Sequence, residues 1–377
     1  MLFSQNHYII GSNNIPIGRK DDYMKVFDYS ALIDRTWDNE IVSYLTQIHE
    51  YKGKQELYIR QKPVELERLI EIARIQSTEA SNRIEGIITT NARLKQLVEN
   101  KTTPRNRDEK EILGYRNALS IVHESYEHIA ITPNYILQLH GEMLKHTAFS
   151  YAGKFKTTAN EIAKTLPDGT KEVIFTPLEP YETPDAVASL CETFRNELNR
   201  GIIDPLILIP CFVLDFLCIH PFNDGNGRMS RLLTLLLLYK SGYMVGQYIS
   251  IEKAIAETKE SYYDTLAVAD YGWMEGENDP KEFIKYMLGI ILSCYREFEN
   301  RVSFAWETGA KSTSYDIVKQ YAQTKIGTFT KQDALIACPS LGSSSVEAAL
   351  KKLVSDGTIE RLGSGRKTHY VRKDSTQ

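Results

Sequence analysis

Residues 220–231 read HPFNDGNGRMSR and lie between two apolar runs, residues 206–219 and 232–239. Each run is long enough for a buried helix, but the first eight residues of the stretch are not expected to continue either helix. Pro221 lacks an amide proton and clashes with the preceding turn, so the first helix should end just before it. The two glycines adopt positive φ at little cost, which lets successive N–H groups point into one hollow at the start of the second helix. The stretch therefore predicts a mainly helical core around an anion-binding loop.

Four side chains add chemistry to this hollow. Arg228 and Arg231 share one face of the helix's first turn and suit the oxygens of a phosphate. Asp224 is a hard oxygen ligand, which suits Mg²⁺ bridging phosphates. His220, whose ordinary pKa is about 6.5, suits proton transfer from an attacking hydroxyl. The alternative is a structural role, with His220 capping a helix and Asp224 paired with Arg228. So many charged groups and glycines in one short stretch favour a site for a metal-bound polyphosphate.

Other phosphate and metal motifs do not fit. The chain has no GxxxxGK[ST] sequence, which excludes a P-loop. A dinucleotide-binding fingerprint fails because a helix precedes the glycines and Ser230 stands where the third glycine should be. His220 and Asp224 cannot form the helical zinc-ligand pair of a metalloprotease, because Pro221 and Gly225 interrupt the helix that such a pair requires.

Composition sets limits on the whole chain. At 377 residues, two or three structural units are expected. The net charge of −4 argues against a general nucleic-acid or membrane-surface binder. The five cysteines are scattered and never form CxxC, so neither a disulfide framework nor a zinc site is expected, and a reducing cytoplasm is the simplest compartment. No secretory or membrane-spanning segment is apparent.

Hydrophobic periodicity and turn signals predict three regions, residues 1–107, 108–305 and 312–373. The first begins with an irregular or short-strand arm. Extended segments at 155–163 and 173–176, around the turn sequence Pro167-Asp168-Gly169, predict a hairpin in the second region. The third reads as three helices and a two-stranded hairpin, which is the winged-helix arrangement. Helices are expected at residues 39–60, 63–86, 108–128, 133–146, 184–198, 251–270, 280–304, 314–325, 331–337 and 343–356.

The sequence HPFNDGNGRMSR resembles the Fic motif, HxFx(D/E)GNGRxxR, at every defined position. The resemblance covers residues 108–292, and the hairpin is similar to the Fic flap. It implies a Fic-type helical core with a small β-hairpin flap, acting as a protein adenylyltransferase that transfers AMP from ATP to a Tyr, Ser or Thr hydroxyl of a protein. Self-modification is one form of that activity.

The resemblance also implies roles for residues. His220 would be the general base, and Asp224 would bind Mg²⁺. The anion hole would be formed by Gly225, Asn226 and Gly227, and the nucleotide phosphates would contact Arg228 and Arg231. The target would pair with the flap at Asn160, Glu161, Ile162 and Ala163. The adenine side would involve Tyr262 and Tyr263, followed by Asp270 where the family commonly has Asn; their alternative role is helix packing.

A second motif lies upstream. Residues 81–86 read SNRIEG, which is similar to the Fic inhibitory motif (S/T)xxxE(G/N). The alternative is an ordinary helix end with a surface glutamate. The resemblance instead implies that the helix at about residues 64–86 is an intramolecular brake. Glu85 would pair with Arg231 and occupy the guanidinium that the γ-phosphate of ATP needs.

Two alternatives remain open. Glu85 could orient water for removal of AMP, which would make the enzyme bifunctional or predominantly de-AMPylating. The winged helix could instead make the chain a DNA-binding regulator, although Glu347 on its expected recognition helix opposes this, and such domains also mediate protein contacts and dimerisation. Its basic residues are Lys351, Lys352, Arg361, Arg366, Lys367, Arg372 and Lys373. The target protein and the oligomeric state, with a homodimer as the common default, are not set by the sequence.

Overall fold

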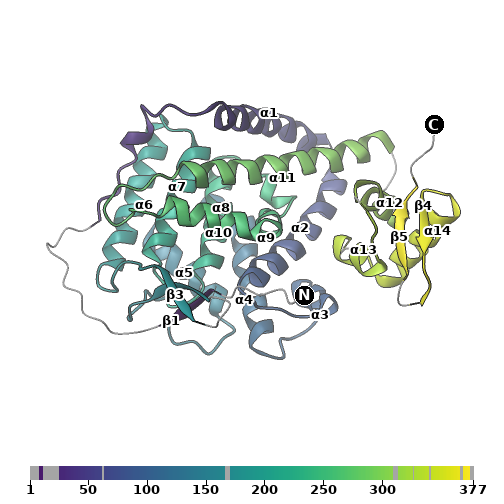
Figure 1. Cartoon of the computed structure of the whole chain (residues 1–377), viewed down its shortest axis with the longest axis horizontal. Coiled ribbons are helices and arrows are strands. Elements are labelled where there is room, and N and C mark those ends of the chain that lie inside the picture. The colour runs from purple at the N-terminus through teal and green to yellow at the C-terminus, as the bar shows by residue number, and fades with distance from the viewer. Residues whose placement is uncertain are drawn as a thin grey trace.

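The structure is a computed structural model that describes residues 8–11, 25–61, 63–165, 170–308, 313–325, 327–338, 341–365 and 368–373. The described chain is mainly helical, with two small antiparallel sheets (Figure 1). The strands are β1 (Tyr8–Gly11), β2 (Glu161–Thr165), β3 (Lys171–Phe175), β4 (Ile359–Leu362) and β5 (His369–Arg372). The α-helices are α1 (Asn39–Gln61), α2 (Pro63–Ile84), α3 (Asn91–Val98), α4 (Arg107–Ser125), α5 (Pro133–Leu144), α6 (Thr183–Arg200), α7 (Pro205–Ile219), α8 (Asn226–Lys240), α9 (Ile251–Glu257), α10 (Lys259–Ala269), α11 (Lys281–Thr308), α12 (Ser314–Thr324), α13 (Lys331–Ala337) and α14 (Ser343–Ser355). Short 3₁₀ turns lie at Ser30–Leu32, Tyr126–His128 and Val245–Gln247.

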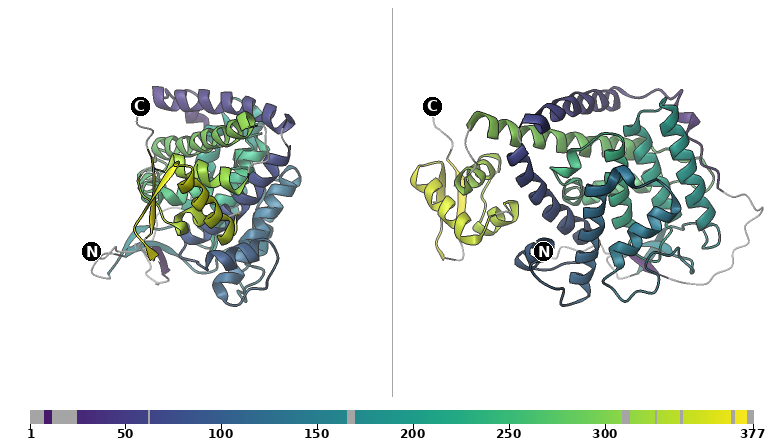
Figure 2. Two further views of the ribbon diagram at one scale, coloured as in Figure 1. Left: turned by 90° about the vertical axis from the view of Figure 1, so that its right-hand side faces the viewer. Right: turned by 180° about the vertical axis from the view of Figure 1, so that it is seen from behind.

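Helices α7 and α8 form the centre of the large core. Almost every residue of both helices is buried, because α6, α4 and α11 pack around them. Helix α7 starts where the Asp204 side chain accepts from the Leu206 N–H at 2.8 Å, with Pro205 in the first turn. It ends at Ile219, and the next residue, His220, takes the left-handed backbone conformation. Two further views show α1, in purple, running along α11 at the edge of the large core (Figure 2). None of the helices in the described ranges is long and apolar enough to cross a membrane.

The expected hairpin is present and has a third strand. Strand β2 pairs antiparallel with β3 on one side and with β1 on the other, with Ile10 opposite Ile162 and Gly11 opposite Glu161. The strand β2 begins only at Glu161, so the prediction of an extended segment from residue 155 was too long. The turn sequence at residues 167–169 lies outside the described residues. The N-terminal arm thus supplies the edge strand of the flap.

Several predicted helices differ from the structure at their ends, and three departures concern the central loop or a whole helix. Helix α8 begins at Asn226, so the last two residues of the expected loop belong to the helix. The segment expected as one helix at 251–270 is divided into α9 and α10 at Thr258. Helix α3 was not expected; it begins where the Thr90 side chain accepts from the Arg93 N–H.

The C-terminal segment has a hydrophobic core of its own, shared by α12, α13, α14 and β4. Helices α12 and α13 each start with a capping box, formed by Thr313 with Asp316 and by Thr330 with Asp333. An isolated bridge joins Phe329 to Tyr370 of β5. The order of three helices and two strands agrees with the elements expected there, while the winged-helix assignment stays a prediction. Figure 1 shows this group beside the end of α11.

Candidate active site

His220 lies at the junction of α7 and the loop, with φ 49° and ψ 60°. Its Nδ1 is 3.2 Å from the Leu217 carbonyl, which places the ring proton on Nδ1 and leaves Nε2 as an acceptor. Nε2 is buried and has no hydrogen-bond partner among the described residues. Burial, and then the positive charge of Lys156, lower the pKa of His220 to about 4. The imidazole is therefore neutral near pH 7, and its Nε2 can accept a proton.

His140 on α5 holds the loop through hydrogen bonds and ring stacking. Its Nδ1 accepts from the Gly153 N–H at 3.0 Å, and its Nε2 donates to the Asp224 carbonyl at 3.0 Å. The ring stacks on Phe222 with centroids 3.7 Å apart and an interplanar angle of 7°. Burial lowers the pKa of His140 to about 4, which keeps the ring neutral. Sequence reasoning missed this residue because a single histidine within an amphipathic helix carries no spacing signal.

The two residues that open α8 fix the shape of the hollow. Gly225 has φ 87°, and a Cβ there would lie 2.6 Å from Cε of Met143. The Asn226 side chain accepts from the Phe222 N–H at 2.9 Å and donates to the Phe222 carbonyl at 2.7 Å. Asn226 therefore closes the loop with its side chain, and only its backbone faces the anion-binding end of the helix.

Arg228 is buried against two carboxylates. Its Nη1 lies 2.8 Å from Oε2 of Glu111 on α4, and its Nη2 lies 3.5 Å from Oδ1 of Asp224. Glu111 also accepts from Arg107 Nε at 2.8 Å. Nη1 of Arg228 is engaged by Glu111, whereas its Nε makes no hydrogen bond in the described chain and remains a donor for another oxygen. Glu111 was not predicted as a site residue, because its partner lies far away in the sequence.

Arg231 joins α8 to α2. Its Nη2 donates to Oε1 of Glu85 at 2.8 Å and to the Ser81 carbonyl at 2.9 Å, while its Nε donates to Oγ of Ser81 at 2.9 Å. A Cβ at Gly227 would lie 2.3 Å from Oε1 of Glu85, so this carboxylate rests on the first turn of α8. Burial alone would raise the pKa of Glu85, but the Arg231 charge and hydrogen bond outweigh it and lower that pKa. The Glu85–Arg231 contact expected from the sequence is thus present.

The first of the predicted flap residues contacts the loop at residues 220–225. Nδ2 of Asn160 donates to the Phe222 carbonyl at 3.2 Å. Ile162 and Ala163 lie in β2, where β1 occupies the edge expected to hold the target. Glu161, opposite Gly11, lies at the end of that edge nearest to the loop.

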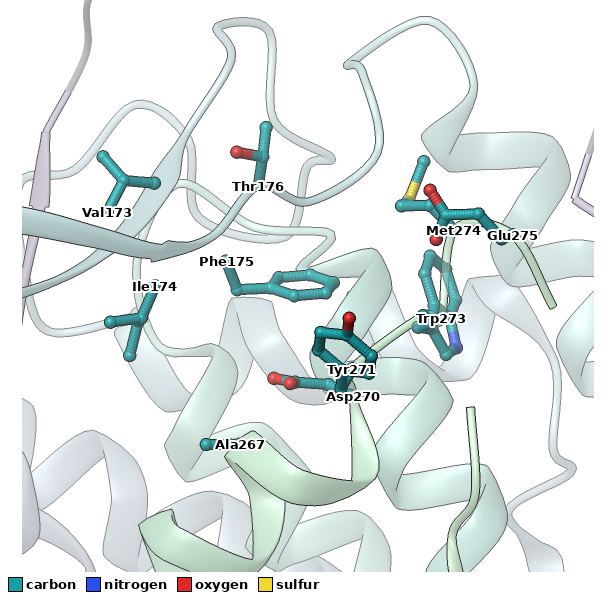
Figure 3. A pocket seen from close by; sticks show the side chains of 11 residues that line it. Val173, Ile174, Phe175, Thr176, Ala267, Asp270, Tyr271, Trp273, Met274 and Glu275 are labelled. Atoms are coloured by element: carbon teal, nitrogen blue, oxygen red, sulfur yellow. The ribbon is translucent and has the colours of Figure 1, made fainter. Parts of the chain in front are cut away.

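The predicted adenine-side residues separate into two groups. Tyr262 is buried within an aromatic cluster with Tyr263, Phe283 and Tyr286, which agrees with the alternative of helix packing. Asp270 instead lines a cavity of about 320 Å³ between β3 and the end of α10. The remaining lining residues are Val173, Ile174, Phe175, Thr176, Ala267, Tyr271, Gly272, Trp273, Met274 and Glu275 (Figure 3). Burial raises the pKa of Asp270 to about 6.

Among the described residues, no cluster of three or more His, Cys, Asp or Glu side chains could hold a metal ion by itself. Mg²⁺ is usually held by one or two carboxylates together with substrate phosphates and water. The Asp224 side chain is 36% exposed and lies beside the partly unsatisfied Arg228, so it fits that manner of binding.

The chain is similar to known proteins over part of its length. Residues 130–238 match the model of the Fic/DOC family. Protein adenylyltransferase fic-1 of Caenorhabditis briggsae is 28% identical over 184 residues, which cover 48% of this chain and 32% of that protein. Protein adenylyltransferase Fic of Drosophila erecta is 27% identical over 268 residues, which cover 68% of this chain and 49% of that protein. The chain thus spans between a third and a half of the length of these relatives.

A solved structure extends the likeness to most of the fold. The crystal structure of a Fic family protein from Desulfovibrio desulfuricans G20 matches 91% of this chain and 98% of that chain, with a TM-score of 0.58 and 22% identity. Residues 130–238 thus match the Fic/DOC family model, and the fold is similar to that of a Fic family protein.

Proposed function

We propose that the chain is a protein adenylyltransferase, transferring AMP from ATP to a Tyr, Ser or Thr hydroxyl of a protein. The observation that carries the proposal is the loop itself, which brings an unpartnered His220 Nε2, the start of α8 and Arg228 into one site. The names of the matched relatives point to the same activity.

In the proposed reaction, the target's hydroxyl oxygen attacks the α-phosphorus of ATP. The bond from that phosphorus to the pyrophosphate oxygen breaks, pyrophosphate leaves, and the hydroxyl proton passes to Nε2 of His220. The N–H groups of the first turn of α8, with Arg228, stabilise the negative charge on the phosphates. Asp224 would hold Mg²⁺, which when bound supplies further positive charge to the phosphates. Positioning and charge stabilisation account for most of the acceleration.

We further propose that Glu85 restrains this activity. Its carboxylate lies at the start of α8, where an anionic phosphate would otherwise be favoured, and it engages Arg231 at 2.8 Å. While that pair persists, Arg231 cannot contact the γ-phosphate, and ATP is held in a non-reactive pose.

The test replaces Glu85 with glycine. Incubation of the Glu85→Gly chain with ATP should add the mass of one AMP per modified hydroxyl, on itself or on an added protein, at a rate on the order of 10- to 100-fold above wild type. Intact-mass spectrometry identifies both the reaction and the nucleotide donor. Glu79→Gly is the control, because it places a glycine in α2, which ends just before Glu85, but removes a carboxylate that pairs with Arg83 instead of Arg231. If Glu85→Gly binds ATP normally yet labels nothing, the brake model is wrong.

A second substitution tests the base. His220→Ala in the Glu85→Gly background should reduce labelling by about 10²- to 10⁴-fold, because it removes the proton acceptor. ATP binding, measured by calorimetry, should change little. Full labelling by the double variant would exclude His220 as the base.

Removal of AMP is the alternative activity of the same site. The Glu85 carboxylate rests on the first turn of α8 at Gly227, the end of the helix that would face the nucleotide phosphates. AMP-modified protein incubated with wild type and with Glu85→Gly separates the two activities. Loss of AMP only when Glu85 is present would assign removal to the intact chain.

A further inference from the structure

Lys156 is a buried lysine between α5 and the flap, and its side chain is not used in the proposed reaction. Lys156 is only 2% exposed. Its Nζ donates to Oδ1 of Asn160 at 2.9 Å and to the Ile219 carbonyl at 3.1 Å, and its backbone N–H donates to the Pro221 carbonyl at 2.8 Å. Lys156 therefore donates hydrogen bonds to the main chain on both sides of His220.

Asn160 continues this attachment toward the flap. Its amide accepts from Lys156 through Oδ1 and donates through Nδ2 to the Phe222 carbonyl at 3.2 Å. Asn160 directly precedes β2, whose first residue is Glu161. The two side chains and the backbone N–H of Lys156 thus connect the segment before β2 to three carbonyls around His220, those of Ile219, Pro221 and Phe222.

These hydrogen bonds alone do not require a charged group, because a neutral donor could satisfy the same carbonyls. The charge has its own effect, since an ammonium near the imidazole disfavours a second positive charge there. Burial lowers the pKa of Lys156 to about 8, opposed by the carboxylates of Glu179 and Glu182, so it remains largely charged at neutral pH. The negative charge of Glu85 has the opposite effect and raises the pKa of the His220 imidazole.

We infer that Lys156 is a positioning residue for the transfer reaction: it connects the flap to the loop around His220, and its ammonium adds to burial in disfavouring a positive charge on the imidazole of His220. Lys156 acts through His220 and through Asn160. The inference rests on the proposed function only for the reaction that the imidazole serves, because the electrostatic effect exists whatever that reaction is.

The first test measures the imidazole directly and needs no activity. The chain is labelled at histidine, and the His220 signal is assigned by comparison with His220→Gln. Its titration is then followed by NMR in wild type, Lys156→Gln, Lys156→Met and Lys156→Arg. The two neutral variants should move the His220 midpoint upward by about 1 pH unit, whereas Lys156→Arg should leave it near wild type. Lys154→Met is the matched control, since this neighbouring lysine is exposed and should have no effect.

The second test uses labelling by ATP in the Glu85→Gly background. In the neutral variants the acid limb of the pH–rate profile for kcat/KM should move to higher pH, and Lys156→Arg should restore it. Asn160→Leu separates the two roles, because it should reduce the rate without moving the His220 midpoint.

The outcomes distinguish this inference from the proposed function. An unchanged His220 midpoint in both neutral variants would overturn it, even if labelling were observed. A shifted midpoint in a chain that labels nothing would support the electrostatic role while contradicting adenylyl transfer. Loss of the folded spectrum in both neutral variants would reduce Lys156 to a structural residue and also overturn the inference.

Discussion

At the scale of single residues, Asp215 on α7 is a buried carboxylate that the proposed chemistry of the loop does not use. It accepts from the Tyr29 hydroxyl at 2.6 Å and from Nε1 of Trp273 at 2.7 Å. These bonds tie the segment after the N-terminal arm and the loop after α10 to the central helix. Burial nevertheless dominates, raising the pKa of Asp215 from 3.8 to about 6.

This shift gives a stability prediction with a defined sign. The folded chain holds the Asp215 proton up to a higher pH than the unfolded chain does, so the contribution is present below pH 3.8 and is lost as pH rises through about 6. Asp215→Asn cannot ionise and keeps both partners satisfied, because the Tyr29 hydroxyl also accepts. Its free energy of unfolding relative to wild type should therefore increase by on the order of 3 kcal/mol between about pH 4 and about pH 7.

Urea unfolding across that pH range provides the measurement. Asp264→Asn is the control, because Asp264 is exposed on α10 and should give a curve parallel to that of wild type. Parallel curves for Asp215→Asn as well would mean that Asp215 is not protonated in the folded chain.

At the scale of elements, what the sequence predicted depended on how locally each feature is determined. The ends of α7 and the Glu85–Arg231 contact were predictable, since proline, glycine and a motif carry that information within a few residues. The division of α9 from α10 was not, because Thr258 is an ordinary helix residue without a proline or glycine beside it. Glu111 and His140 were missed for a different reason: their roles depend on partners that only the tertiary fold brings together.

Strand β1 is the clearest case of such long-range placement. It pairs with β2 across roughly 150 residues of sequence, with Tyr8 opposite Lys164 and Gly11 opposite Glu161. The proposed target would use this same edge, because an extended segment binds by adding a strand. The chain's own arm and a target therefore compete for one set of backbone groups.

Removal of residues 1–11 should expose that edge. Amide hydrogen exchange should accelerate in β2 and stay unchanged in α7 and α8. In the Glu85→Gly background the initial rate on an added protein should rise by about fivefold, which corresponds to about 1 kcal/mol. Ile9→Pro and Ile10→Pro should differ from one another, because successive amides along a strand point to opposite sides and only one of them faces β2. Identical exchange in β2 with and without the arm would refute this competition.

At the scale of the whole molecule, the described residues contain two main hydrophobic cores. The larger surrounds α7 and α8, and the smaller belongs to α12, α13, α14 and β4. We propose that residues 312–373 form a domain separate from the catalytic core at 108–305 and from the N-terminal region at 1–107. The separate C-terminal core supports that boundary, because a segment that buries its own apolar residues does not need the remainder of the chain for them.

The charges of this C-terminal segment bear on whether it binds DNA. On α14, Glu347 lies 2.7 Å from Nζ of Lys331 and 3.3 Å from Nζ of Lys351. Lys352 lies over the Tyr315 ring, 4.6 Å from its centroid. Arg366 and Lys367 are outside the described residues. A helix whose lysines are already engaged by a carboxylate and an aromatic ring presents a weak electrostatic surface to phosphates, which favours a protein partner over DNA.

The full-length chain should therefore produce no shift of duplex DNA in a gel assay, even at low salt. Glu347→Gln releases both lysines from their shared carboxylate and should give weak binding that disappears as salt is raised, because neutralised phosphates release counterions. Glu360→Gln is the matched control, since it removes an equal negative charge from β4 without freeing those lysines. Salt-sensitive binding by the wild-type chain, at the same strength as Glu347→Gln, would show that the Glu347 pairs do not prevent contact with phosphates and would restore the DNA-binding hypothesis.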